Sequence, residues 1–223
     1  MTDIKNTFPR PPLTRERVLK AAVDVADREG LGALTMRRLG AELGVEAMSL
    51  YKHVTNKEEV LDGIIELVVG DIETPREVAD WKEAMRRRAI SARAVLGRHS
   101  WAIGLLEARG SKGPTVLRYL DAILGNLRSA GFSLENAVHA FWLIDSFVYG
   151  HVIQETSLPI GSSEEITEST GSILEQVTMD EYPHLVEIGE HALRSEYSYD
   201  SEFEFGLDLI LEALDRTETS TAD

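Results

Sequence analysis

Cysteine is absent from this sequence of 223 residues, which excludes disulfide bonds and thiolate zinc sites and is typical of a protein in the reducing cytoplasm. No apolar run reaches the roughly 18–20 residues that cross a bilayer, and residues 1–12 lack the apolar stretch of a secretory signal. The sequence also has no glycine-rich phosphate loop and no Gly-x-Ser-x-Gly nucleophile elbow. These absences predict a cytoplasmic protein that does not enter a membrane, needs no cofactor and is not an enzyme.

Basic residues are scarce overall, with 23 Lys and Arg against 38 Asp and Glu and a formal net charge of −15. Taken alone, this charge disfavours a nucleic-acid partner, because phosphate contacts need cations. The distribution is uneven, however: residues 1–57 carry 10 basic and 7 acidic side chains, whereas residues 155–223 carry 2 and 18. The acidity lies at one end of the chain, so a local basic surface near the N-terminus can still bind DNA.

Alternating apolar and polar residues, the pattern of a β-strand, are rare, whereas apolar residues recur every three or four positions. This periodicity predicts an all-α protein. Thr14 is an N-cap for a helix that ends at Gly30, and Asn56 caps a helix over 57–73, with Glu59 in the capping-box position. Further helices are expected over 35–43, 47–53, 77–97, 101–109, 114–130, 134–156, 171–178, 183–195 and 200–216, with a polar loop over 158–171.

Residues 35–54 have the pattern of two short helices joined by a sharp turn at Gly44. Gly40 and Ala41 are small enough to let the helices approach closely, and Leu39, Leu43, Val45, Leu50 and Val54 are expected to pack inward. The side chains left to point outward are Arg37, Arg38, Ala47, Met48, Ser49, Tyr51, Lys52 and His53, with Lys57 at the start of the next helix. Hydroxyls, cations and small apolar groups together suit a DNA major groove. From periodicity alone, a helical hairpin with a polar surface is an equal alternative.

A longer pattern separates these two interpretations: Leu34-Thr35-x-Arg37-x-Leu39-x-x-x-Leu43-Gly44-Val45-x-x-x-Ser49-Leu50-Tyr51-x-His53-Val54-x-Asn56-Lys57. It resembles the DNA-binding domain of the TetR family of transcriptional regulators. The resemblance implies a helix-turn-helix whose third helix enters the major groove. It assigns phosphate contacts to Tyr51, His53 and Lys57 and base contacts to Arg37, Ala47, Met48, Ser49 and Lys52, with Thr35 and Arg38 as further candidates. Thymine methyl groups are expected opposite Ala47 and Met48.

The remainder of the chain resembles the larger domain of the same family more weakly. The segments Gly131–Ala137 and Phe203–Leu214, with Trp81 and Pro183, are similar to segments that begin and form the two helices of a four-helix dimer interface. A homodimer is therefore implied, with a candidate interface made by Phe141, Val148, Phe203, Leu207, Ile210 and Leu211. The alternative is that both helices belong only to the core of one protomer.

The resemblance also implies a small-molecule effector. Leu106, Ala92 and Arg88 stand where the tetracycline-binding members of the family have a metal-chelating histidine, an aromatic wall and an asparagine. This departure predicts an apolar or aromatic effector other than magnesium–tetracycline. The candidate residues for lining the effector site are Trp101, Leu105, Leu106, Trp142, Asp145 and Tyr149. The alternative for each of them is a side chain that only packs in the hydrophobic core.

Two clusters of polar residues are expected to be solvated helix surface. One is the run Arg86-Arg87-Arg88, and the other is His184, Glu187 and His191, whose spacing a metal could use although no further ligand is in sight. No metal site is predicted.

We therefore expect a homodimeric repressor that leaves a pseudo-palindromic operator when a small molecule binds. Its parts are an arm (1–13), a DNA-binding domain (14–60), a ligand-binding and dimerisation domain (61–216) with helix 57–73 as connector, and a polar tail (217–223). A helical small-molecule-binding protein or enzyme without DNA function is the alternative, and activation instead of repression stays open.

Overall fold

The computed structural model describes residues 12–75, 80–109, 113–157, 163–194 and 198–219, and in these residues it contains helices and no strands. The all-α prediction is confirmed. The elements are α1 (Arg15–Glu29), a 3₁₀ turn (Leu31–Ala33), α2 (Met36–Leu43), α3 (Ala47–Leu50), α4 (Lys57–Gly70), α5 (Trp81–Arg98), α6 (Trp101–Arg109), α7 (Pro114–Ser129), α8 (Leu134–Ser157), α9 (Ser163–Leu174), α10 (Pro183–Arg194) and α11 (Tyr199–Thr219). None of the described helices is long and apolar enough to span a membrane.

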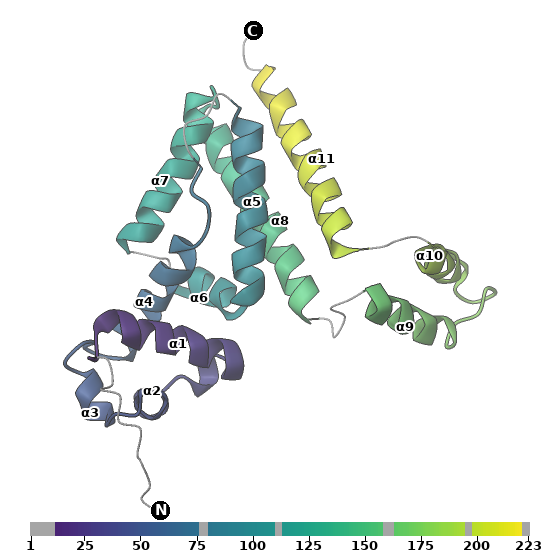
Figure 1. The fold of residues 1–223 in the computed structure, drawn as a ribbon. Helices are drawn as coiled ribbons and strands as arrows, with labels where there is room; N and C mark the ends of the chain where they lie inside the picture. Colours follow the sequence, from purple (N-terminus) through teal and green to yellow (C-terminus); the bar gives the residue numbers. More distant parts are fainter. Residues whose placement is uncertain (1–11, 76–79, 110–112, 158–162, 195–197, 220–223) are drawn as a thin grey trace, which may run out of the picture.

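The smaller domain, formed by α1 to α3, lies at one end of the molecule (Figure 1). Its helix ends follow from local sequence: the Thr14 side chain accepts the N–H of Arg17, and the Asn56 side chain accepts the N–H of Glu59 at 2.8 Å. α1 packs closely on α4, because a Cβ at Gly63 would lie 2.6 Å from a methyl carbon of Leu19. The start of α4 is therefore part of this domain.

The larger domain is a bundle in which α5, α7 and α8 pack together and α11 lies along α8 and α5 (Figure 1). Trp81 at the start of α5 meets Phe132 before α8, with ring centroids 4.8 Å apart in a T-shaped arrangement. α4 contacts α1 on one side and α6 and α7 on the other. α4 runs as a single helix across residues 60 and 61 and contacts helices of both groups.

Several predicted boundaries are wrong. The helix expected over 47–53 ends at Leu50 and continues as a turn, and the helix expected over 57–73 ends at Gly70. The largest error concerns 158–178: instead of a loop followed by a helix, residues 163–174 form α9 and residues 175–178 lie outside any helix. α9 has a polar composition but packs on α10, where a Cβ at Gly189 would meet the Leu174 side chain at 2.7 Å. The predicted arm falls almost entirely outside the described residues, as does the tail beyond Thr219.

Candidate DNA interface and ligand cavity

The helix-turn-helix depends on a close approach of α2 and α3. A Cβ at Gly40 would lie 2.9 Å from the carbonyl oxygen of Val45 and 3.1 Å from the amide nitrogen of Ala47, so only glycine fits. Gly44 makes the turn in the left-handed region, with φ 65° and ψ 37°. Leu39, Leu50 and Val54 are buried, as predicted, and Leu43 and Val45 are half-buried against the same core. Ala41 is exposed and takes no part in the approach.

The predicted DNA-contacting side chains are mostly accessible. Met48 is 75% exposed and Tyr51 46% exposed. Thr35, Arg37 and Lys52 are also exposed, whereas Ala47, Ser49, His53 and Lys57 are half-buried. Within the described residues, no carboxylate pairs with Arg37, Lys52 or Lys57. Three cations, on α2, in the turn after α3 and at the start of α4, are thus available to an outside anion.

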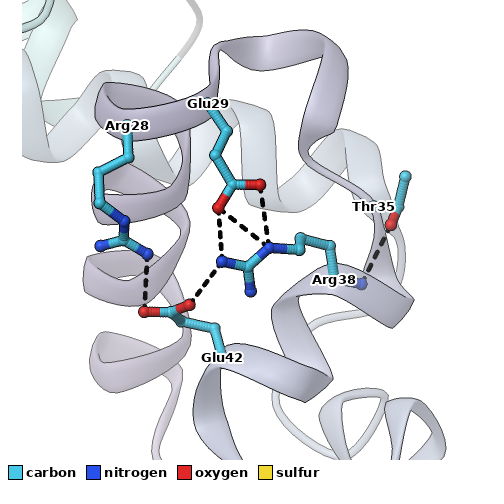
Figure 2. Close-up of polar contacts among 5 residues, drawn as sticks. All are labelled: Arg28, Glu29, Thr35, Arg38 and Glu42. Carbon is cyan, nitrogen blue, oxygen red and sulfur yellow. Dashed lines mark hydrogen bonds and ion pairs between the residues drawn. The ribbon is translucent and has the colours of Figure 1, made fainter.

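Arg38 differs from these three cations, as Figure 2 shows. Its guanidinium pairs with Glu29 at 2.5 Å and with Glu42 at 2.8 Å, and Glu42 also pairs with Arg28 at 2.8 Å. The hydrogen bonds from Arg38 lower the pKa of both carboxyl groups. Thr35 caps α2 by accepting the Arg38 N–H at 3.1 Å. The Arg38 side chain is therefore engaged in joining α2 to the end of α1.

A cavity of about 120 Å³ lies in the larger domain between α4, α5, α6, α7 and α8. Four of the six predicted lining residues do line it: Leu106, Trp142, Asp145 and Tyr149. Trp101 and Leu105 do not, since the Trp101 indole donates to Asp27 and Leu105 is buried in the core. The other lining residues are Val69, Ile72, Arg88, Ala92, Leu96, Glu107, Val116, Tyr119, Leu120 and Phe141.

Arg88, which the sequence placed both at a drug-contacting position of the family and in a solvated run, is buried in the wall of this cavity. It is 1% exposed, whereas its neighbours Arg86 and Arg87 pair with Asp208 and Glu73 at the surface, so the run is not one solvated surface. Arg88 Nε donates to the Tyr119 hydroxyl at 3.0 Å, and Nη2 donates to Asp145 Oδ1. Helical periodicity could have predicted the burial of Arg88, because it lies four residues after Ala84 and four before Ala92, which are both buried on α5.

Asp145 and Tyr149 complete this polar group on the wall of the cavity. Asp145 is 4% exposed, and its Oδ2 accepts a long hydrogen bond of 3.4 Å from the Tyr149 hydroxyl. Burial, reinforced by the nearby Tyr119, raises the pKa of Tyr149 to about 12. Tyr149 therefore keeps its proton at neutral pH and remains a hydrogen-bond donor.

Helix α6, which contributes Leu106 and Glu107 to the cavity, is attached to the DNA-binding side at both ends. At its start, Asp27 of α1 accepts the Trp101 indole N–H at 2.6 Å and lies 2.8 Å from His99 Nδ1. At its end, Arg109 pairs with Glu58 and Asp62 of α4. α6 is thus joined to α1 and α4 by side-chain hydrogen bonds and ion pairs at both of its ends.

The predicted dimer-interface residues face mainly inward. Val148, Phe203, Leu207 and Leu211 are buried between α8, α11 and the rest of the protomer, and Phe141 and Ile210 are half-buried. Four of the six predicted residues therefore belong to the core of the protomer, and both sides of α8 carry apolar side chains. The exposed apolar side chains on these helices are Leu134, Val138, Trp142, Leu143, Ile153, Phe205 and Leu209.

The histidines with metal-like spacing lie on the surface. His184, Glu187 and His191 are all exposed on α10. Among the described residues, no group of three or more His, Asp or Glu side chains is arranged to hold a metal ion.

Two family models match the chain in succession: bacterial regulatory proteins of the tetR family over residues 18–64, and the tetracyclin repressor-like C-terminal domain over residues 74–217. The HTH-type transcriptional repressor DrrR1 of Streptomyces coeruleorubidus is 33% identical over 216 residues, covering 93% of this chain and 79% of that protein. The tetracycline repressor protein class C of Escherichia coli is 30% identical, covering 95% of this chain and 94% of that protein.

A solved structure agrees with these relatives. ActR from Streptomyces coelicolor in complex with actinorhodin has a TM-score of 0.76 and 28% identity, covering 93% of this chain and 99% of that chain. Both halves of the chain therefore match one kind of protein in the same order. The chain belongs to the TetR family of bacterial transcriptional regulators.

Proposed function

We propose that this protein is a ligand-responsive repressor that binds a pseudo-palindromic operator as a homodimer. The observation that carries the DNA-binding assignment is that Arg37, Lys52 and Lys57 lack a carboxylate partner among the described residues, whereas Arg38 is held by two. Phosphates attract cations that are not already neutralised. Because the Arg38 guanidinium is engaged by Glu29 and Glu42, its role is to orient α2 rather than to contact DNA.

The remaining contacts divide by chemistry. Tyr51, His53, Lys57 and the Thr35 hydroxyl hold phosphates, and Lys57 acts together with the N-terminus of α4. Arg37, Ala47, Met48, Ser49 and Lys52 read bases. Met48 is the most exposed apolar side chain of the domain, and such a side chain gains most by covering a thymine methyl group.

Dimerisation uses the outward sides of α8 and α11. Leu134, Val138, Leu143, Phe205 and Leu209 are each at least 45% exposed, which is costly for large apolar side chains in water. A second copy that presents the same two helices covers them in a symmetric four-helix contact. The two DNA-binding domains of the dimer then contact two half-sites of the operator. One short recognition helix touches too few base pairs to specify such a site alone.

Effector release starts at the cavity. Its volume of about 120 Å³ is smaller than the roughly 300 Å³ or more of typical ligand sites. A multi-ring ligand must therefore displace a wall, and Leu106 on α6 is attached through Trp101 and Arg109 to the DNA-binding side. Leu106 offers a metal no ligand and Ala92 supplies no aromatic wall, so the proposed effector differs from magnesium–tetracycline. ActR, solved with actinorhodin, is a relative whose fold accommodates a small molecule.

Selection of bound DNA from a random pool tests the proposal. The wild-type protein is expected to enrich a pseudo-palindrome with half-sites one helical turn or a multiple apart. Arg37→Ala combined with Tyr51→Ala should abolish this enrichment while leaving the fold intact, because both side chains are exposed. Arg28→Ala combined with Lys20→Ala, which removes two paired cations of α1, serves as the control and should enrich the same site. Failure of the wild-type protein to enrich any sequence would contradict the proposal.

A further inference from the structure

Arg88 holds a buried guanidinium whose donors are only partly used. Nε and Nη2 donate to Tyr119 and Asp145, but Nη1 is inaccessible to solvent and has no hydrogen-bond partner among the described residues. A buried cationic donor without an acceptor is uncommon in folded proteins, because its lost hydration is uncompensated. Arg88 lines the cavity, so a bound molecule that displaces the wall and reaches Nη1 can supply the missing acceptor.

The charged side chains on the cavity wall determine whether the acceptor group of the ligand can itself carry a charge. Arg88 and Asp145 neutralise each other, and Glu107 is the third charged side chain among the lining residues. Glu107 is exposed to solvent, and the only buried cation among the described lining residues is already paired with Asp145, so a carboxylate ligand would bring an uncompensated charge beside Asp145. A carbonyl oxygen accepts from Nη1 without bringing a charge into the site.

The rest of the cavity indicates what carries this oxygen. Four aromatic rings line it, those of Tyr119, Phe141, Trp142 and Tyr149, together with aliphatic side chains. Trp142 is 55% exposed and stands at the rim, so its ring can move when the site fills. Flat aromatic ligands suit such a wall, since ring pairs gain from stacking and edge contacts.

We infer that the effector is an uncharged aromatic compound that presents a carbonyl oxygen to Nη1 of Arg88. This inference rests on the proposed effector site and specifies its chemistry. Arg88 is thereby a ligand-recognition residue, and Asp145 and Tyr119 position its guanidinium.

Three probes with one ring framework test the inference by equilibrium dialysis against the full chain: 9-fluorenone, fluorene and fluorene-9-carboxylate. Fluorenone should bind about tenfold or more tightly than fluorene, because a hydrogen bond to a charged group is worth roughly that factor or more. The carboxylate should bind no better than fluorene. Equal binding of fluorenone and fluorene, tighter binding of the carboxylate, or no binding of any probe would each overturn the inference.

A double variant assigns the effect to Arg88. Arg88→Met with Asp145→Leu removes both charges at once, which avoids an unpaired buried ion, and it should reduce the preference for fluorenone to less than about threefold. The matched control, Arg87→Met with Glu73→Leu, removes the surface ion pair of the neighbouring arginine on α5 and should retain the preference. If the double variant keeps the preference, Arg88 is not the recognition residue. If the double variant does not fold, the comparison of the three probes on the wild-type protein still tests whether the site prefers a neutral carbonyl compound. Operator selection is independent of these measurements, so the two proposals can fail separately.

Discussion

Lys57 is the first residue of α4, and within the described residues it has no carboxylate partner. If it contacts a phosphate, its removal must reduce the number of counterions released on DNA binding. A homodimer has two copies, so Lys57→Ala removes two contacts, and the slope of log K against log salt should flatten by about 1.8. Between 50 and 200 mM salt, the variant should lose about 12-fold less affinity than the wild-type protein. Fluorescence anisotropy with a labelled operator at several salt concentrations measures this slope.

Lys20→Ala is the control, because it changes the net charge by the same amount. Lys20 Nζ lies 2.7 Å from Glu16 Oε1 on α1, so its charge is already locally neutralised. For Lys20→Ala, the slope of log K against log salt should change by less than about 0.5, since Lys20 displaces no condensed counterion from the DNA. Equal flattening in both variants would show that overall charge and not a contact at Lys57 governs binding, and no flattening in Lys57→Ala would show that Lys57 does not touch phosphate.

Three further predictions concern separate parts of the molecule. Replacing the thymines opposite Met48 by uracil should weaken operator binding several-fold in the anisotropy assay, and unchanged affinity would show that Met48 contacts no methyl group. Gly40→Ala should destabilise the protein by about 1–3 kcal/mol in urea unfolding, because the new Cβ meets backbone atoms, whereas Gly125→Ala, with open space around it, should be neutral or stabilising. Asp27→Ala should cost roughly 1–3 kcal/mol, because it removes the acceptor of Trp101 and His99, whereas Asp24→Ala on the same helix should change stability by less than about 0.5 kcal/mol. Equal effects within either pair would contradict the packing described here.

Local sequence signals predicted several helix ends of the N-terminal domain correctly. Thr14, Asn56 and Gly44 determine helix ends through contacts within a few residues, so their effect is visible in the sequence. The close approach at Gly40 was likewise predictable, since its position between two short helices requires a small residue. The ion pairs of Arg38 could not be predicted, because Glu29 and Glu42 lie on both sides of a turn whose geometry only the fold defines.

The larger domain was harder to predict, because its details depend on which elements meet. Val148 and Leu143 lie on different sides of one apolar helix, and only the packing of α5, α7 and α11 on α8 decides which of them is buried. Arg88 is buried because Asp145, 57 residues later, provides its counter-charge. Polar α9 is a helix beside α10, a partner that its own sequence does not reveal.

The stoichiometry on the selected operator tests the central claim most directly. Sedimentation of the protein with a duplex that carries the full pseudo-palindrome should give two protomers per duplex, and a duplex with a single half-site should bind at least a hundredfold more weakly, because half of the phosphate and base contacts are lost. One protomer per duplex, with equal affinity for the half-site, would contradict a dimeric repressor with two DNA-binding domains.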